Sequence, residues 1–98
     1  MAFRLIWSPA ARDDLRDVVS FIARDSKSRA ETFGFSLMRE VERLRDHPEL
    51  GRVVPELAVP SIRELVVRSY RLIYRVSKEN NSVEVVRVWH AARGAPEL

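Results

Sequence analysis

The sequence predicts an α+β fold: a short N-terminal strand, an antiparallel helical hairpin and then a three-stranded antiparallel meander. Three observations predict it. Apolar residues recur at three- and four-residue steps in two consecutive segments, as in two amphipathic helices. β-branched and aromatic residues dominate from residue 62 to residue 90. The chain has 98 residues and is 46% hydrophobic, enough to bury one modest core, so we expect one domain over residues 1–98.

The N-terminal segment indicates a strand followed at once by a helix. Phe3 to Trp7 is apolar and aromatic except for one arginine, which favours a strand. Ser8 offers its hydroxyl to the free amides of a helix start, and Pro9 fits the first helical position. This helix is predicted to end near Asp25. Its apolar stripe consists of Ala11, Leu15, Val18, Val19 and Ile22.

A second helix is predicted to begin at Ser28, where Glu31 completes a capping box, and to end at Pro48. Its apolar stripe consists of Ala30, Phe33, Leu37, Val41 and Leu44. Only a few polar residues separate the two helices. They therefore form an antiparallel hairpin whose stripes pack on a common surface.

The remaining residues supply that surface. Residues 48–60 are rich in proline and are predicted to form an ordered loop. The link Arg68-Ser69 is so short that its strands must be antiparallel neighbours, and Asn80-Asn81 favours a hairpin turn. The three predicted strands cover residues 62–67, 70–76 and 83–89.

The net charge of +3 lies wholly in the second half of the chain, which contains eight Lys and Arg residues and five Asp and Glu residues. Alternation along the central strand places Arg71 and Arg75 on the face opposite Tyr70 and Tyr74. Together with guanidinium groups from the neighbouring strands, they are expected to form a basic face that suits phosphates or carboxylates. An ordinary solvated surface is the alternative.

Composition excludes several classes of site. The chain has no cysteine, which removes disulfides, thiolate zinc sites and cysteine nucleophiles. It also lacks a glycine-rich phosphate loop and histidines at metal-ligand spacing, so no cofactor or metal is expected. The apolar run at the N-terminus is too short for a secretion signal or a membrane span, so we expect a cytoplasmic protein that does not enter a membrane.

The two histidines differ. His47 precedes Pro48 and is interpreted as a residue that satisfies helix C-terminal carbonyls. His90 ends the last predicted strand beside Trp89 and close to Arg93. An imidazole in that position suits acid-base chemistry on RNA or a protein interface, and a partly buried histidine that closes the sheet edge is the alternative.

Several runs, in this order and spacing, resemble the ParE branch of the RelE/ParE toxin superfamily along nearly the whole chain. These runs are residues 7–11 with Asp14-Leu15, then residues 47–52, 54–57, 62–67, 70–76, and finally 86–90 with Arg93. The resemblance implies the toxin of a type II toxin–antitoxin system, neutralised by a ParD-like antitoxin. It implies contact with operator DNA only through that antitoxin. ParE-like members are associated with poisoning of DNA gyrase.

The resemblance leaves two other functions open. RelE-like and YoeB-like members cleave messenger RNA on the ribosome, and here Arg71 and His90 would act with Glu64 or Glu49. The lysines and the C-terminal tyrosine typical of RelE are missing. An inactive homologue that only binds its antitoxin is the third possibility.

The sequence thus yields two sets of candidate residues. The target-binding set consists of Arg63, Arg71, Arg75, Arg87, Trp89, His90 and Arg93. The antitoxin-binding set consists of the apolar residues Leu50, Val53, Val54 and Leu57. The alternative for the second set is that these residues close the core beneath the loop.

Overall fold

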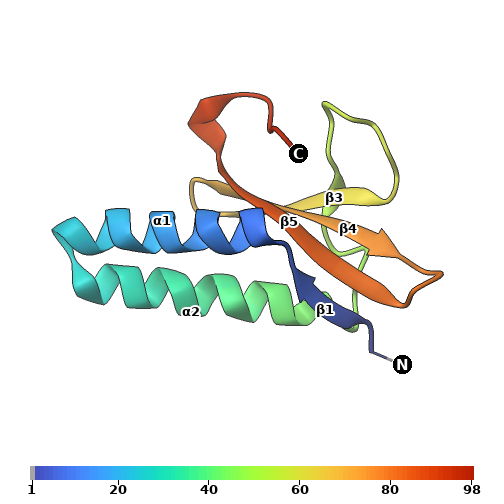
Figure 1. The fold of residues 1–98 in the computed structure, drawn as a ribbon, viewed down its shortest axis with the longest axis horizontal. Coiled ribbons are helices and arrows are strands. Elements are labelled where there is room, and N and C mark those ends of the chain that lie inside the picture. The colour runs from blue at the N-terminus through green and yellow to red at the C-terminus, as the bar shows by residue number, and fades with distance from the viewer. Residues whose placement is uncertain (1) are drawn as a thin grey trace.

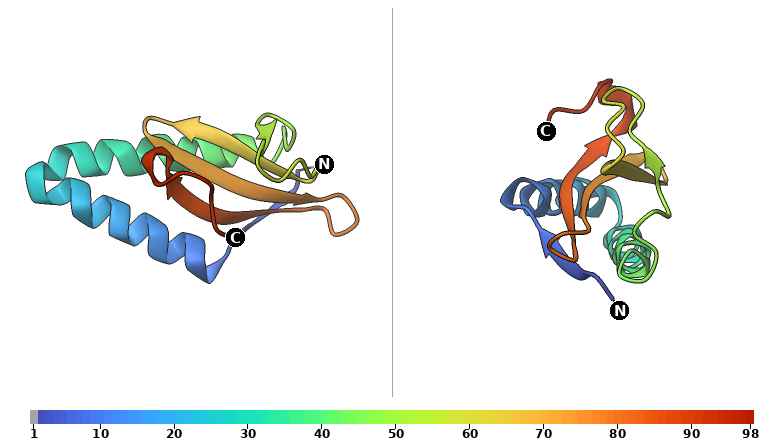
Figure 2. Two further views of the ribbon diagram at one scale, coloured as in Figure 1. Left: turned by 90° about the horizontal axis from the view of Figure 1, so that it is seen from above. Right: turned by 90° about the vertical axis from the view of Figure 1, so that its right-hand side faces the viewer.

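A computed structural model describes residues 2–98. It contains a helical hairpin that covers one face of a five-stranded sheet (Figures 1 and 2). The sheet order is β1-β5-β4-β3-β2. The predicted meander is confirmed as β3 (Ile62–Val67), β4 (Tyr70–Ser77) and β5 (Ser82–His90), and both of its pairings are antiparallel. The fold class is therefore as predicted.

The N-terminal strand β1 (Arg4–Trp7) pairs in parallel with β5 and forms one edge of the sheet. Ser8 then caps α1 (Pro9–Asp25): its Oγ accepts from the Ala11 amide at 3.0 Å and donates to the Val86 carbonyl at 2.9 Å. A single side chain thus starts the helix and ties that start to the last strand. The predicted end of this helix at Asp25 is confirmed.

The second helix, α2 (Lys27–Arg43), begins earlier than predicted. Ser26, not Ser28, is its N-cap, because Ser26 has extended backbone angles and its Oγ accepts from the Arg29 amide at 3.1 Å. Only Ser26 separates the two helices. The helix also ends before Pro48, since residues 44–46 form a turn.

The loop after the hairpin is ordered, as predicted, but it contains a two-residue strand, β2 (Arg52–Val53), that pairs with Arg63 and Glu64 of β3. This pairing completes the second edge of the sheet. The residues that follow, 55–61, are all exposed and carry the loop back to β3. A short 3₁₀ turn, Ala91–Arg93, follows β5.

The main core lies between the helices and one face of the sheet. It joins the predicted stripes of α1 and α2 to Leu72, Tyr74, Val83, Val85 and Val88. A smaller cluster of Val54, Ile73, Trp89 and Ile62 lies on the opposite face. The register between β4 and β5 shifts after Ile73, which leaves Val86 as an extra residue in a bulge. Within residues 2–98 no helix is long and apolar enough to cross a membrane.

Candidate functional site

Arg71 lies at the centre of a partly buried charged network on the sheet face away from the helices. Its Nη1 and Nη2 donate to the two carboxylate oxygens of Glu56 at 2.7 and 2.6 Å, and its Nε donates to Glu64 Oε1 at 2.6 Å. Arg52 Nε donates to the other oxygen of Glu64 at 2.7 Å. The Glu64 side chain is fully buried and that of Arg71 is 10% exposed. Every nitrogen of the Arg71 guanidinium therefore already has a carboxylate partner.

The network shifts the pKa values of Glu56 and Arg71 in the directions that keep both side chains charged. The hydrogen bonds from Arg71, aided by a backbone hydrogen bond, lower the pKa of Glu56 from its ordinary value of 4.5 to about 2. The hydrogen bonds to Glu56 and then Glu64 raise the pKa of Arg71. The Glu56–Arg71 pair therefore remains fully ionised at neutral pH.

This shift predicts how the pair responds to acid. Because the pKa of Glu56 is lower in the folded chain, its contribution to stability is complete above pH 4.5 and is lost as the pH falls through about 2. The carboxyl ¹³C resonance of Glu56 should titrate with a midpoint near 2. In an Arg71→Ala control the midpoint should move back toward 4.5. A wild-type midpoint near 4.5 would show that the two side chains do not pair in solution.

The other arginines of the predicted basic face are also paired. Arg87 Nε and Nη2 donate to the carboxylate of Asp14 at 2.7 and 2.9 Å, and these hydrogen bonds raise the pKa of Arg87. Arg75 pairs with Glu84 on the adjacent strand at 3.2 Å. Arg71, Arg75 and Arg87 do share one face, as predicted, but each pairs with a carboxylate, so the prediction that this face is basic is wrong.

Arg63 does not join this face. It is the partner of Tyr74 in the β3–β4 register, and Tyr74 belongs to the core on the helix side. Arg63 Nη1 donates to the Gly51 carbonyl at 2.9 Å, and Nη2 lies 3.8 Å from Glu49. Because side chains alternate along a strand, Arg63 and Arg71 point to opposite faces.

Trp89 is the partner of Arg71 in the β4–β5 register and is only 2% exposed. The Arg93 guanidinium lies 3.8 Å from the centre of its ring, that of Arg87 lies 5.1 Å away, and the indole donates to the Gly94 carbonyl at 3.1 Å. Trp89 therefore holds the C-terminal segment against the sheet, and little of its ring is left for a partner to touch.

His90 lies on the face opposite Arg71. Its ring packs edge-on against Tyr70 with centroids 4.9 Å apart, and Tyr70 in turn packs on Phe33 of α2. Its Nδ1 accepts from the Ala92 amide at 3.0 Å. The trio of Arg71, His90 and Glu64 considered for RNA cleavage is therefore split between the two faces.

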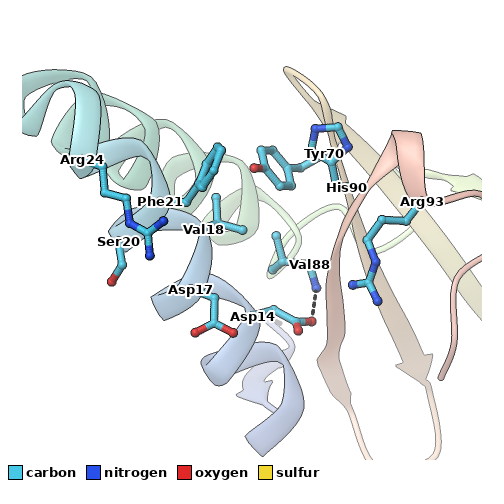
Figure 3. Close-up of a pocket in the computed structure, with 10 residues that line it drawn as sticks. All are labelled: Asp14, Asp17, Val18, Ser20, Phe21, Arg24, Tyr70, Val88, His90 and Arg93. Carbon is cyan, nitrogen blue, oxygen red and sulfur yellow. Dashed lines mark hydrogen bonds between the residues drawn. The ribbon is translucent and has the colours of Figure 1, made fainter.

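His90 instead lines an open cleft of about 420 Å³ between α1 and the ends of β4 and β5 (Figure 3). Arg93 and Tyr70 line it from the sheet side, and α1 contributes residues that the sequence analysis did not identify, including Phe21 and Arg24. Phe21 is 63% exposed. Its position off the predicted apolar stripe of α1 was the signal available in the sequence.

The predicted antitoxin-binding residues divide in two. Val54 is fully buried in the smaller core cluster, so its assignment to a binding surface is wrong. Leu50 and Leu57 are partly exposed, at 39% and 38%. A more apolar surface, which was not predicted, is a groove between α1 and α2 where Phe35 is 73% exposed. Phe35 also lies off the predicted stripe of its helix.

The described residues also bear on metal binding. Within residues 2–98, no group of three or more His, Asp or Glu side chains is arranged to hold a metal ion.

Comparison with known proteins places this geometry in a family. A family model described as the ParE toxin of the type II toxin–antitoxin system parDE matches residues 5–94. A search of curated proteins returned no match.

Three solved structures share the fold. A chromosomal ParDE toxin–antitoxin system from P. aeruginosa is 18% identical, with 91% of this chain and 96% of that chain covered and a TM-score of 0.72. A mutant of the E. coli toxin RelE in the free state is 22% identical, with 96% and 88% covered and a TM-score of 0.68. The toxin–antitoxin complex RelBE2 from Mycobacterium tuberculosis is 22% identical, with 92% of each chain covered and a TM-score of 0.65. From the family match and the shared fold together, this chain belongs to the ParE toxin family of type II toxin–antitoxin systems.

Proposed function

We propose that this toxin inhibits DNA gyrase by binding it and does not cleave RNA. The observation that carries the proposal is the division of the nuclease candidates: Arg71 is saturated by two carboxylates, and His90 lies on the other face of the sheet. A general acid has to reach the same phosphate as the cation that stabilises its charge. Because gyrase acts on chromosomal DNA, the proposal also places the toxin in the cytoplasm.

The candidate gyrase contact is the cleft lined by His90 and Arg93. Of the predicted target-binding set, these two residues lie in an open depression next to the exposed aromatic Phe21. The Arg93 guanidinium and the Nε2 of His90 can each take part in a hydrogen bond with a partner there. Buried Trp89 and carboxylate-paired Arg71 and Arg87 are poorer contacts.

Purified toxin is expected to inhibit gyrase supercoiling and to leave messenger RNA intact on programmed ribosomes. Arg93→Ala should raise the inhibitory concentration by roughly tenfold or more, as expected for an arginine near the centre of an interface. The control is Arg45→Ala, which removes a partly exposed arginine that pairs with Glu42 and does not line the cleft. Cleavage of messenger RNA on the ribosome would contradict the gyrase proposal and favour the nuclease. If the toxin affected neither supercoiling, messenger RNA nor growth, it would be an inactive homologue.

We also propose that the cognate antitoxin covers the groove between α1 and α2. The groove is lined mainly by apolar side chains from both helices. It continues toward β1 as a second depression, and the two depressions share several lining residues. The apolar residues and the glycine along it are Trp7, Leu15, Val19, Ala30, Gly34, Phe35 and Met38, and the charged residues that also line it are Arg12, Arg16 and Glu31. An exposed apolar trough on a small protein marks a surface that a partner buries, and an amphipathic helix fits that shape.

Phe35→Ala is expected to weaken antitoxin binding by about tenfold or more, because an exposed aromatic anchor is lost while the toxin's own core is untouched. Calorimetric titration with the antitoxin encoded beside the toxin would measure the change. Leu57→Ala tests the loop surface predicted from the sequence and serves as the comparison. If Leu57→Ala weakens binding and Phe35→Ala does not, the antitoxin docks on the loop instead of the groove.

A further inference from the structure

Arg71 presents a two-pronged anion site that the chain fills with a carboxylate of its own. We infer that Glu56 stands in for a carboxylate of a partner protein, and that an acidic segment of that partner displaces Glu56 from Arg71 on binding. This inference rests on the proposed function only in assuming that the toxin acts by binding proteins. Under this inference, the sheet face that carries Arg71 can bind a partner although its charges are paired within the chain.

The two carboxylates on Arg71 are held very differently. Glu64 is fully buried in the middle of β3, where it fixes Nε of the guanidinium and is itself fixed by Arg52. Glu56 lies on the exposed loop 55–61, and its side chain is 37% exposed. If Glu56 swings away, the Arg71 fork keeps its position and direction. A nearly buried arginine that faces a partly exposed carboxylate is an arrangement suited to exchange of the anion.

The surroundings favour a carboxylate over a phosphate as the incoming group. The network contains two arginines and two glutamates, so it is neutral, and replacing one carboxylate by another keeps it neutral. A phosphate dianion would add a second negative charge beside the buried carboxylate of Glu64, where the low dielectric makes repulsion expensive. The planar fork also matches a carboxylate in the two-point geometry that Glu56 already adopts.

The rim of the site points to a peptide. Val66 is the register partner of Arg71 on the same face and is 62% exposed. Leu57, directly after Glu56, is 38% exposed. An acidic residue with an apolar neighbour would therefore meet both the guanidinium and an apolar rim. That combination fits an acidic segment of a protein better than a nucleic-acid backbone.

The test uses acetate as the simplest carboxylate and follows the Arg71 Nε–Hε resonance by NMR. In the full chain carrying Glu56→Ala, acetate should shift this resonance saturably, with an affinity at least about tenfold above that of the wild type. Inorganic phosphate at matched ionic strength should bind more weakly than acetate. The control is Glu49→Ala, which makes the same charge change on a glutamate paired with Arg63 and Lys78, and it should create no acetate site at Arg71.

Each other outcome overturns part of the inference. Equal acetate binding in the wild type and Glu56→Ala would show that Glu56 is not a competitor, and no saturable binding in Glu56→Ala would show that no latent site exists. Tighter phosphate binding would assign the site to a phosphate. Acetate should also raise the melting temperature of Glu56→Ala. Adding Arg71→Lys to Glu56→Ala keeps a charge but removes the fork, and acetate should then leave the melting temperature unchanged. None of these measurements involves gyrase, so they are independent of the supercoiling assay.

Discussion

Arg71→Ala is expected to lower the free energy of unfolding by about 3 kcal/mol, the scale for breaking a buried ion pair from one side. The carboxylate of Glu64 stays fully buried in the variant and loses the 2.6 Å hydrogen bond from Arg71 Nε, with only Arg52 left to compensate. Urea denaturation near neutral pH would measure the loss.

The matched control is Arg75→Ala, on the same strand and the same face. Its pair with Glu84 is exposed, at 48% and 35%, so its removal should cost less than about 1 kcal/mol. A double variant, Arg71→Met with Glu64→Leu, should recover most of the stability lost in Arg71→Ala, because no buried charge remains. Equal losses in Arg71→Ala and Arg75→Ala would mean that burial of the network contributes nothing.

Gly51→Ala is expected to be the most destabilising small substitution, at about 3 kcal/mol, the upper end for overpacking a filled site. A Cβ at this position would overlap the backbone carbonyl of Glu64 and lie 2.8 Å from the Tyr74 hydroxyl. It would also disturb the 2.8 Å hydrogen bond from the Gly51 amide to that buried hydroxyl. Backbone cannot rotate away as a side chain can, so β2 would have to separate from β3.

Gly34→Ala is expected to have the opposite effect on stability, as measured by thermal and urea unfolding. Gly34 lies inside α2 with open space around the position of a Cβ, so alanine should stabilise the chain by roughly 0.5–1 kcal/mol through helix propensity. Were both glycine variants to unfold at the wild-type denaturant concentration, the close approach of Gly51 to β3 would not exist in solution.

The regular elements were predictable because each depends on residues close together in the chain. The three- and four-residue apolar steps located both helices, and runs of β-branched residues located β3, β4 and β5 to within one residue at each end. Ser28 was predicted as the cap because Glu31 follows it at capping-box spacing, but this local pattern does not fix which serine caps the helix. Only the backbone angles of Ser26 decide it.

The candidate site was less predictable because its partners are distant in sequence. Arg87 pairs with Asp14, which lies 73 positions away in the sequence. Arg71 pairs with Glu56, which lies in a loop whose conformation the apolar pattern does not predict. Arg63 was placed on the wrong face although alternation along β3 relates it to Glu64, because the register with β4 was unknown. The fold of this chain could thus be predicted from local patterns, whereas the pairing of its charges required the tertiary structure.

Because β1 pairs in parallel with β5, the sheet cannot be completed on the ribosome until β5 has been synthesised. The amide of Ser8 donates to the carbonyl of Val85, and its hydroxyl reaches Val86, 78 positions later. β1 therefore has no neighbour until residues 82–85 have been made, and such long-range closure is slow. A nascent or truncated chain lacking residues 82–90 cannot complete this sheet, so the toxin gains its folded surfaces only after β5 has been made.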